Sequence, residues 1–356
     1  MIGNRIERAR SAAGLSQRAL AEMVSLSAMA ISKYERDEVT PGSDVLLRLA
    51  KALGVRVEYF FRSEEVHLEH VEYRKRGDLK APEKKKILAE VEDQLERWLA
   101  LEEFLPGEWS QKFDLSPELP QRIESLNDIE AVALALRDAW KLGHNPIPDL
   151  IDTLEEHGIR VITVPGDEDE LFDGLSATCC DGMPVVVVGS RWPGDRQRFT
   201  LAHELGHLVV NGRLSEKIDE EKAANRFAGA FLAPRDAIYK TLGKKRKLLE
   251  LQELILLKAE YGMSVQGLLY RAGDLEILSQ GACRGMWTFL RNNNLYDKEL
   301  GEPYPPEQTR LFKQRVYRAM AEELIGESKA AELLGIPLIE LRQCRHMECP
   351  SHAADK

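Results

Sequence analysis

The chain has 356 residues, of which 44% are hydrophobic and 30% charged, and its formal net charge is −10 at pH 7. This composition excludes a largely disordered chain, a collagen and a coiled-coil rod, and no apolar run approaches the roughly 18 residues of a membrane-spanning helix. The length indicates two or three domains. The first residues form no apolar secretory signal and five cysteines are too few for a disulfide scaffold, so we expect a cytoplasmic protein that contacts no membrane.

The charge balance changes sign near residue 63. Residues 1–62 carry ten Lys/Arg and seven Asp/Glu, a balance of +3, whereas residues 63–127 carry ten basic and sixteen acidic residues, a balance of −6. We therefore expect a first domain at 1–62, followed at 63–127 by a helical linker.

Residues 1–62 have the pattern of four short helices. Gly14-Leu15-Ser16 is a helix stop followed by an N-cap, Leu26-Ser27 is a second turn and cap, and Pro41-Gly42-Ser43 precedes a last helix over 44–53. The side chains expected to face inward are Ile2, Ile6, Ala9, Leu20, Met23, Ile31, Tyr34, Leu46, Leu47, Leu49 and Ala50.

The segments 15–22 and 27–35 resemble the repressor-type (XRE) helix-turn-helix family. The resemblance implies that the helix after Ser27 enters the major groove of DNA. It places Ser27, Ala28, Met29, Ser32 and Lys33 at the bases, and Gln17 and Arg18 at phosphate. Ala28 and Met29 offer no hydrogen bonds, so readout would depend on DNA shape and methyl contacts. The alternative is a helical bundle that makes protein contacts or a dimer.

Residues 82–105 form an amphipathic pattern. Ile87, Val91, Leu95, Trp98 and Leu99 recur at intervals of three and four, with charges between them. The stripe covers about two heptads, which is too short for a coiled coil alone. We interpret it as a connecting helix that packs on the next domain rather than as a dimer coil.

Helices over 129–142 and 150–157, followed by apolar strands over 159–164 and 184–188, indicate an α+β domain. Val185–Val188 precede the most informative motif of the chain. Two interpretations of that strand remain open: a strand beside a cleft, whose edge pairs with an extended peptide, or a buried central strand.

That motif is His203-Glu204-Leu205-Gly206-His207. Residues four apart share one face of a helix, so the two imidazoles can bind one zinc ion, while Glu204 is placed to take a proton from water. Apolar neighbours on both sides predict a buried helix, where two His and a Glu are costly unless they bind something. Gly206 costs about 1 kcal/mol in a helix, which is tolerable if something must approach closely there.

A catalytic zinc site needs a third protein ligand. The segment 219–228 has helical spacing, and Glu221 lies three residues before Ala224 of its apolar face. Glu221 is therefore the first choice, and Glu220, at the edge of that face, is the second.

The run from 128 to 234 resembles the ImmA/IrrE family of zinc metallopeptidases. The resemblance is carried by Arg137-Asp138-Ala139-Trp140, Asn145-Pro146-Ile147, Phe172-Asp173-Gly174-Leu175-Ser176, the segment 198–207, and Glu221 to Phe227 with Leu232-Ala233-Pro234. It implies that His203, His207 and Glu221 hold Zn²⁺ and that Glu204 is the general base. Ala223 departs from the family's frequent Glu-Ala-Asn, but this position is not a ligand.

Fusion of the two units also resembles an arrangement known in the family. It implies a zincin-like peptidase domain at 128–240 that cleaves a repressor, or this chain itself, in the control of stress-response or mobile-element genes. A homodimer on a palindromic site would fit the helix-turn-helix class.

Residues 241–356 have the pattern of a mostly helical C-terminal domain with a disordered tail. Lys329–Gly335 followed by 339–342 resembles part of a second helix-turn-helix, and Cys344, His346, Cys349 and His352 could form a small metal site or belong to the tail. The expected fold is thus an all-α head, an α+β zincin-like domain and a helical end. The leading hypothesis is a DNA-binding zinc endopeptidase; the alternative is a transcriptional regulator whose peptidase-like domain acts as sensor or scaffold without proteolysis.

Overall fold

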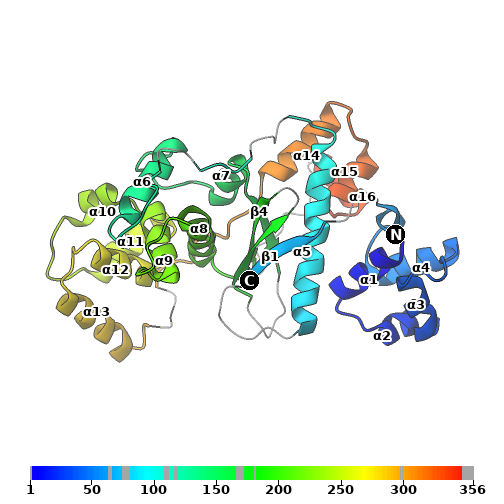
Figure 1. Cartoon of the computed structure of the whole chain (residues 1–356), viewed down its shortest axis with the longest axis horizontal. Coiled ribbons are helices and arrows are strands. Elements are labelled where there is room, and N and C mark those ends of the chain that lie inside the picture. The colour runs from blue at the N-terminus through cyan, green and yellow to red at the C-terminus, as the bar shows by residue number, and fades with distance from the viewer. Residues whose placement is uncertain are drawn as a thin grey trace.

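The protein is described here from a computed structural model, which covers residues 2–62, 66–73, 81–107, 112–115, 119–165, 172–179, 182–296, 298 and 300–346. Figure 1 shows three parts along its longest axis: a small helical head, a central sheet between helices, and a helical lobe at the far end. None of the described helices is both long and apolar enough to cross a membrane.

The head consists of α1 (Ile2–Ala12), α2 (Gln17–Met23), α3 (Ala28–Glu35), α4 (Ser43–Leu53) and the 3₁₀ turn η1 (Val57–Phe61). The predicted caps are present: the Ser16 and Ser27 hydroxyls each accept a hydrogen bond, at 3.1 Å, from the backbone NH three residues later. Its core is formed by Ile6, Leu20, Ile31, Leu49 and Phe60, with residues around them.

Two of the predicted core positions in the head are wrong. Met23 is 57% exposed and Leu47 is 61% exposed. Met23 is the last residue of α2, whose buried positions are Leu20 and Ala21. Leu47 follows the buried Leu46 by one residue, a rotation of about 100° that takes it off the inward face of α4. Tyr34 is only partly buried.

The sheet has the strand order β1-β3-β4-β2, with β1 (Leu68–Tyr73), β3 (Gly174–Cys179), β4 (Met183–Gly189) and β2 (Arg160–Val164). β2 runs parallel to β4, and the other neighbours are antiparallel. Val185 and Val187 pack into one hydrophobic cluster and Val186 and Val188 into another, as alternation along a strand requires. β4 is therefore the buried central strand, and its edges are paired on both sides.

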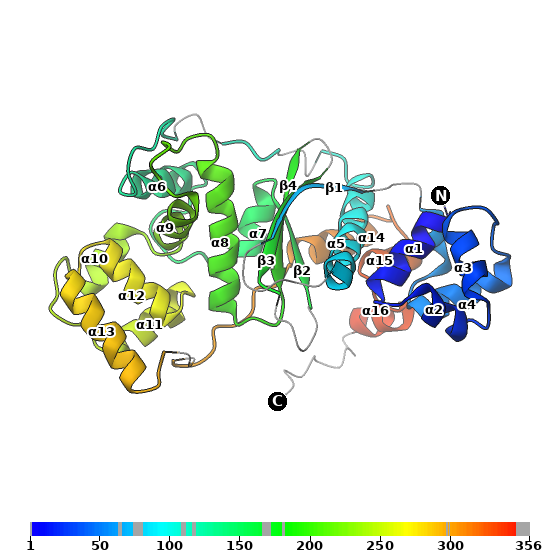
Figure 2. The same cartoon turned by 60° about the horizontal axis from the view of Figure 1, so that its bottom comes forward.

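Helices cover both faces of the sheet. α5 (Ala81–Glu102) lies on one side and α8 (Gly194–Val210) on the other, as both views show (Figures 1 and 2). Ile87, Val91, Leu95 and Trp98 of α5 join the cluster that contains Val185 and Val187, so this helix packs on the following domain as expected.

The segment at 63–127 differs from the helical linker that the charge balance suggests, because it also supplies strand β1. Of the side chains described in that strand, Leu68 and Val71 pack against the sheet's cluster, and Glu69, His70 and Glu72 are exposed. A β-bulge between Glu69 and Glu72 shifts the register, so the apolar side chains are not two residues apart. The alternation that would have revealed a strand is thereby lost.

The lobe beside α8 contains α6 (Ile129–Ala139), α7 (Leu150–Glu156), α9 (Glu220–Leu232), α10 (Arg235–Leu242), α11 (Leu251–Tyr261), α12 (Val265–Asp274) and α13 (Gln280–Asn292). They share one hydrophobic core that runs from Leu119 to Leu290. This core spans the boundary expected at residue 240, and the domain limits therefore stay a prediction.

After α13 the chain returns across the molecule to α14 (Leu311–Ala321), α15 (Glu327–Leu333) and α16 (Leu338–Arg345) (Figure 2). These helices pack with Leu101 of α5 and with Leu105, just after it, in a cluster of their own. Helices α15 and α16 are the pair expected to resemble part of a helix-turn-helix. Cys349 and His352 of the suggested C-terminal metal cluster, and the expected disordered tail after His346, lie outside the described residues.

Candidate metal centre and DNA-binding head

The metal-binding motif lies on α8, in the interior of the lobe. His203 is 1% exposed, and the side chain of His207 is 18% exposed. Their Nε2 atoms lie 3.0 Å apart, because residues four apart in a helix lie one above the other. The two imidazoles thus present their Nε2 atoms to a common point.

Glu221 supplies the third donor from the first turn of α9. Its Oε2 lies 3.6 Å from Nε2 of His203, and its Oε1 lies 3.6 Å from Nε2 of His207. The ligand atoms of the three residues all lie within 4.8 Å of one another, and no other such His, Cys, Asp or Glu group occurs among the described residues. The structure thus brings together the first-choice residues of the sequence prediction.

The other nitrogen of each imidazole has an oxygen partner. Nδ1 of His203 lies 3.1 Å from Oδ1 of Asn225, and Nδ1 of His207 lies 3.0 Å from Oε1 of Glu220. An Nδ1–H donated to these oxygens leaves both Nε2 lone pairs available to a metal. Glu220, the second choice for a ligand, therefore orients a ligand instead.

Asn225 is a site residue that the sequence prediction missed. Its signal was its place four residues after Glu221, one helical turn further along the same face of α9. Together the two imidazoles and one carboxylate, with their outer partners, fit a tetrahedral zinc site that has one open position.

Helix α9 approaches α8 closely at Gly206. A Cβ at this position would lie 3.1 Å from Cα and from the carbonyl oxygen of Ala224, and 3.2 Å from Cδ1 of Phe227. The glycine is therefore the point where the backbones meet, as its cost in a helix suggested. This approach holds Glu221 beside the two histidines.

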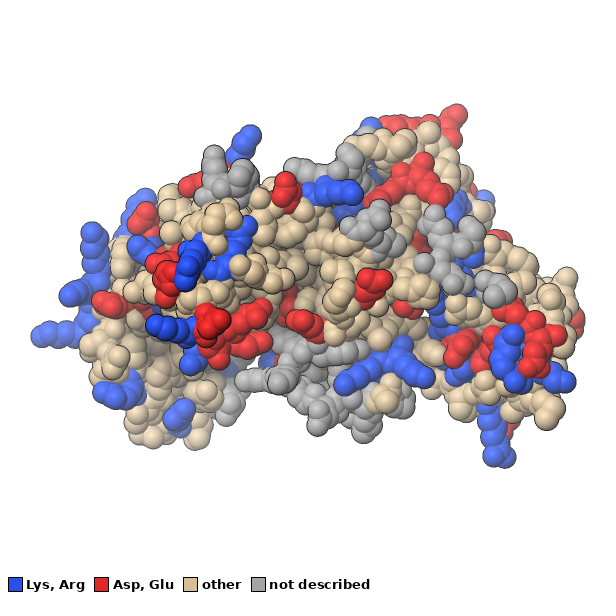
Figure 3. All heavy atoms as spheres, viewed as in Figure 1, with Lys and Arg blue, Asp and Glu red and all other residues tan. Residues whose placement is uncertain are grey.

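Glu204, the predicted base, is 4% exposed and follows His203 in α8. Asp219 caps α9, Glu220 and Glu221 lie in its first turn, and all three are exposed. Figure 3 shows acidic side chains gathered over this part of the molecule. The site thus combines a buried histidine face with an acidic, solvent-facing rim.

A buried ion-pair group fixes the far side of α9. Glu130 of α6 accepts hydrogen bonds from Arg271, one of them at 2.8 Å, and lies 3.0 Å from Nε of Arg226. Burial alone would raise the pKa of the Glu130 carboxyl, but the hydrogen bond and charge of Arg271 and the charge of Arg226 together lower it below its usual value. Arg271 also donates to the carbonyl of Ala233, just after α9.

In the head, the N-terminal end of α3 is open to solvent. Ser27, Ala28, Met29 and Lys33 are exposed, Met29 at 69%, and Ser32 is partly buried. Lysine and arginine side chains are intermixed with acidic ones on the face of the head seen in Figure 3.

The two residues expected at phosphate differ from each other. Arg18 is exposed, with a side-chain exposure of 86%. The Gln17 amide instead donates to Oε2 of Glu35 at 2.6 Å, and Arg10 donates to the same carboxylate. Glu35, which the sequence analysis did not single out, thus joins α1, α2 and α3. The side chain of Gln17 makes a hydrogen bond within the head.

Comparison with known proteins agrees with both parts. Residues 6–60 match the family described as Helix-turn-helix (HTH_3), and residues 154–272 match the IrrE N-terminal-like domain of the Peptidase_M78 family. The chain thus joins a region that matches helix-turn-helix domains to a region that matches a domain of a peptidase family. More particularly, the head is of the XRE type and the second unit is ImmA/IrrE-like.

The curated relatives match the head. HTH-type transcriptional regulator ImmR of Bacillus subtilis (strain 168) is 35% identical over 65 residues, which are 18% of this chain and 51% of ImmR. PuuR of Escherichia coli (strain K12) is 40% identical over 63 residues, and repressor protein C2 of Salmonella phage P22 is 38% identical over 64. Each match covers 18% of this chain; the chain spans about half the length of ImmR and about a third of PuuR and C2.

A solved structure of Bacillus thuringiensis PlcR, in complex with the peptide PapR7 and DNA, aligns over 98% of this chain and 99% of that chain. The sequence identity is 12% and the TM-score 0.17, which is too low to bear on the fold.

Proposed function

We propose that the protein is a DNA-binding zinc metallopeptidase that controls transcription by hydrolysing a peptide bond in a repressor protein. The observation that carries this proposal is the convergence of His203, His207 and Glu221 from two helices, with both imidazoles oriented by oxygen partners. The match of residues 154–272 to a peptidase family supports it.

Zinc held by these three residues would supply the acidity that makes a water molecule nucleophilic near neutral pH. Glu204 would accept the proton of that water and pass it to the leaving amine. Its burial beside His203 keeps the carboxylate out of bulk solvent, where a proton acceptor would be less selective. Asn225 and Glu220 would hold the imidazoles in one orientation throughout.

The head would bring this activity to DNA. Ser27, Ala28, Met29, Ser32 and Lys33 at the start of α3 would face the base edges, and Arg18 with Gln17 would lie at phosphate. The relatives ImmR, PuuR and C2 carry the names of transcriptional regulators or repressors, which supports a role in transcription.

A second candidate function is a transcriptional regulator whose peptidase-like domain acts as a sensor or a scaffold and cleaves no protein. The buried Glu204 favours the peptidase, because a metal site that is only structural needs no neighbouring base.

The experiment that separates the two is Glu204→Gln in the full chain, with the zinc-loaded protein incubated with the repressor encoded beside it. Because the amide cannot accept a proton, cleavage should fall by about 10²–10⁴-fold while zinc content stays the same. His207→Ala should lose both zinc and cleavage. Wild-type gene induction by a Glu204→Gln variant that no longer cleaves would favour the sensor instead, whereas wild-type cleavage by that variant would show that Glu204 is not the base.

A further inference from the structure

Strand β3 contacts α8, and its N-terminal end is fixed to the start of that helix. Asp173 forms an ion pair with Arg196 at 2.5 Å, and Nε1 of Trp192 donates to the Phe172 carbonyl at 2.8 Å. A Cβ on Gly174 would lie 2.9 Å from Cγ2 of Thr200, one helical turn before His203. β3 therefore begins directly beside the metal-binding segment of α8.

The two faces of β3 differ in polarity. Leu175, Ala177 and Cys179 join the cluster on the α5 side of the sheet. Since side chains alternate along a strand, Ser176 and Thr178 face the α8 side, which is the side of the metal centre. A peptide that adds to a sheet edge gains specificity from its alternate side chains, so this face would meet the side chains that such a peptide directs toward α8.

The backbone of β3 is not free, because β1 pairs with it. The antiparallel register joins Leu68 to Cys179, Glu69 to Thr178, Glu72 to Ser176 and Tyr73 to Leu175. β1 comes from the segment between the head and α5, so the chain's own linker lies on this edge (Figure 2).

Two features of β1 weaken its attachment to the sheet. A bulge interrupts its register, and His70 within the bulge has the left-handed φ of 51°, which costs a residue other than glycine about 1–2 kcal/mol. Among the residues of β1 whose side chains are described, Leu68 and Val71 join the cluster and are partly buried, after the fully buried Val66 that precedes the strand; Val185–Val188 of β4 are all fully buried. On the α8 side, Nδ1 of His70 lies 3.2 Å from Oγ1 of Thr178.

We propose that the edge of β3 is the binding site for an extended peptide segment of the protein substrate, and that β1 occupies this site in the free protein as a displaceable internal strand. The identity of the peptide as a substrate rests on the proposed function. The ligand is an extended segment with apolar side chains on the face toward α5 and polar ones toward α8, as β1 itself has. Backbone hydrogen bonds to β3 supply its affinity, and the internal strand must leave first.

The register allows β1 to be cross-linked to β3 by a disulfide after a single substitution. Leu68 pairs directly with Cys179, which is buried and not in a disulfide. Directly paired antiparallel residues have Cα atoms about 4.5–5.5 Å apart, within the range that a disulfide spans. In Leu68→Cys, oxidation should therefore join β1 to β3 covalently, and reduction should release it.

The test uses the full chain without metal and a fluorescein-labelled synthetic peptide with the sequence of residues 66–73, and it measures binding by fluorescence anisotropy. The oxidised Leu68→Cys protein, with the 68–179 disulfide confirmed by peptide mapping, should bind at least about tenfold more weakly than the same protein after reduction. Leu68→Ala/Val71→Ala, which loosens β1, should bind at least about tenfold more tightly than wild type. A scrambled peptide is the control.

Equal peptide binding by the oxidised and the reduced Leu68→Cys protein would overturn the proposal, because the peptide would then bind elsewhere, for example on the outer edge of β1. So would a loosened variant that binds no better than wild type. If that double variant fails to fold, the comparison of oxidised with reduced Leu68→Cys protein still tests the proposal. This assay measures binding and not catalysis, so its result stands even if the Glu204→Gln test contradicts the proposed function. Conversely, if the protein is a peptidase but oxidation of Leu68→Cys leaves peptide binding unchanged, only the present inference is removed.

Discussion

Two residues that do not bind the metal themselves should still affect its affinity, because they hydrogen-bond the two histidines. Asn225 holds Nδ1 of the buried His203, and Glu220 holds Nδ1 of His207 from an exposed position. Because His203 has almost no access to water, no solvent molecule can easily replace its partner. Asn225 should therefore matter more than Glu220.

We predict that Asn225→Ala lowers zinc affinity by about 10–100-fold, since the imidazole of His203 loses the group that fixes its orientation. Competition with a chromophoric chelator measures the affinity. Lys222→Ala, an exposed position on the same helix, is the matched control and should leave it unchanged. Equal affinities for the two variants would mean that Asn225 plays no orienting role.

Glu155, outside the metal centre, should make the stability of the protein depend on pH. Glu155 at the end of α7 is 4% exposed, and neither of its carboxylate oxygens has a hydrogen-bond partner among the described residues. Burial raises the pKa of this carboxyl well above its usual value; Asp152 adds to the effect, and Arg160 and Arg315 oppose it. Stability contributed by the protonated form is therefore present below the unfolded pKa and lost as pH rises through the raised folded pKa.

Glu155→Gln removes the group that must otherwise be charged at high pH. The variant should become more stable relative to wild type between pH 5 and pH 8, by at least about 1 kcal/mol, since one pKa unit corresponds to about 1.4 kcal/mol. Urea unfolding at the two pH values measures this difference. Glu156→Gln, at the exposed neighbouring position, should show no such trend; a flat difference for Glu155→Gln would contradict the assignment.

At the scale of elements, the close contact of α8 with α9 determines the geometry of the metal centre. Gly206→Ala should gain about 1 kcal/mol of helix propensity, but its Cβ would stand 3.1 Å from the Ala224 backbone, so the two helices must separate by a few tenths of an ångström. Glu221 would then move relative to His203 and His207. We expect zinc affinity to fall about tenfold while the thermal midpoint changes little.

Gly285→Ala is the control for this substitution. Gly285 also lies within a helix, α13, but a Cβ there would meet nothing within 4 Å. It should raise the free energy of unfolding by up to about 1 kcal/mol and leave zinc affinity unchanged. Unchanged zinc affinity in Gly206→Ala would show that the contact of the two helices does not set the positions of the donors.

Local sequence patterns predicted the helices well, since capping residues such as Ser16 and Ser27 act within one turn. The pair His203 and His207 was likewise predictable from a spacing of four. What the sequence concealed depends on distant contacts. Strand β1 has polar side chains at three of its positions and exists because it pairs with β3, more than 100 residues away. The division of labour between Glu220 and Glu221 depends on how α9 crosses α8 at Gly206.

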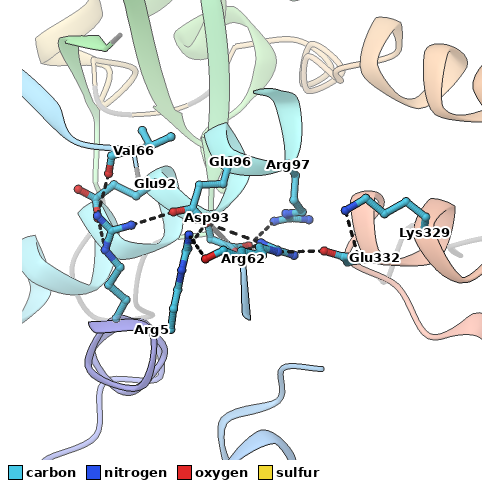
Figure 4. Close-up of polar contacts among 10 residues, drawn as sticks. Arg5, Arg62, Val66, Glu92, Asp93, Glu96, Arg97, Lys329 and Glu332 are labelled. Carbon is cyan, nitrogen blue, oxygen red and sulfur yellow. Dashed lines mark hydrogen bonds and ion pairs between the residues drawn. The ribbon is translucent and has the colours of Figure 1, made fainter. Parts of the chain in front are cut away.

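At the scale of the whole molecule, the head has a core of its own and is attached to the rest by charged groups. Figure 4 shows the attachment: Arg5 and Glu96 form an ion pair, and Arg62 contacts Asp93 at 3.0 Å and Glu332 at 2.9 Å. Arg8 also lies 2.8 Å from Glu96 and donates to the carbonyl of Val66, two residues before β1. The position of the head is therefore connected to the strand on the β3 edge.

This junction contains little apolar packing. A cavity of about 690 Å³ opens there between the head, α5 and the turn from α15 to α16. Tyr59 of the head lies 5.6 Å from the Arg5 guanidinium and 5.1 Å from that of Arg62, and burial with the nearby Asp93 and Glu96 raises the pKa of its hydroxyl to about 12. Ion pairs around a cavity, rather than a shared hydrophobic core, keep the head in place.

Glu96 is the residue on which this attachment should depend most. Its side chain is 2% exposed and it pairs with both Arg5 and Arg8. Glu96→Gln removes the negative charge but leaves the Arg5 guanidinium, 1% exposed, buried without its counter-charge. Removing one partner of a buried pair costs about 3–5 kcal/mol when the other stays charged, which exceeds what the remaining surface contacts supply.

We therefore predict that Glu96→Gln releases the head from α5 while the head itself stays folded on its own core. Hydrogen exchange should become at least tenfold faster in α1 and in the residues around Val66, whereas α8 and α9 keep their protection. Glu22→Gln, which affects only an exposed pair with Arg18 at 3.8 Å, is the matched control and should change neither. If α1 keeps its protection in Glu96→Gln, contacts other than the ion pairs must hold the head, and the connection between the position of the head and β1 through Val66 loses its physical basis.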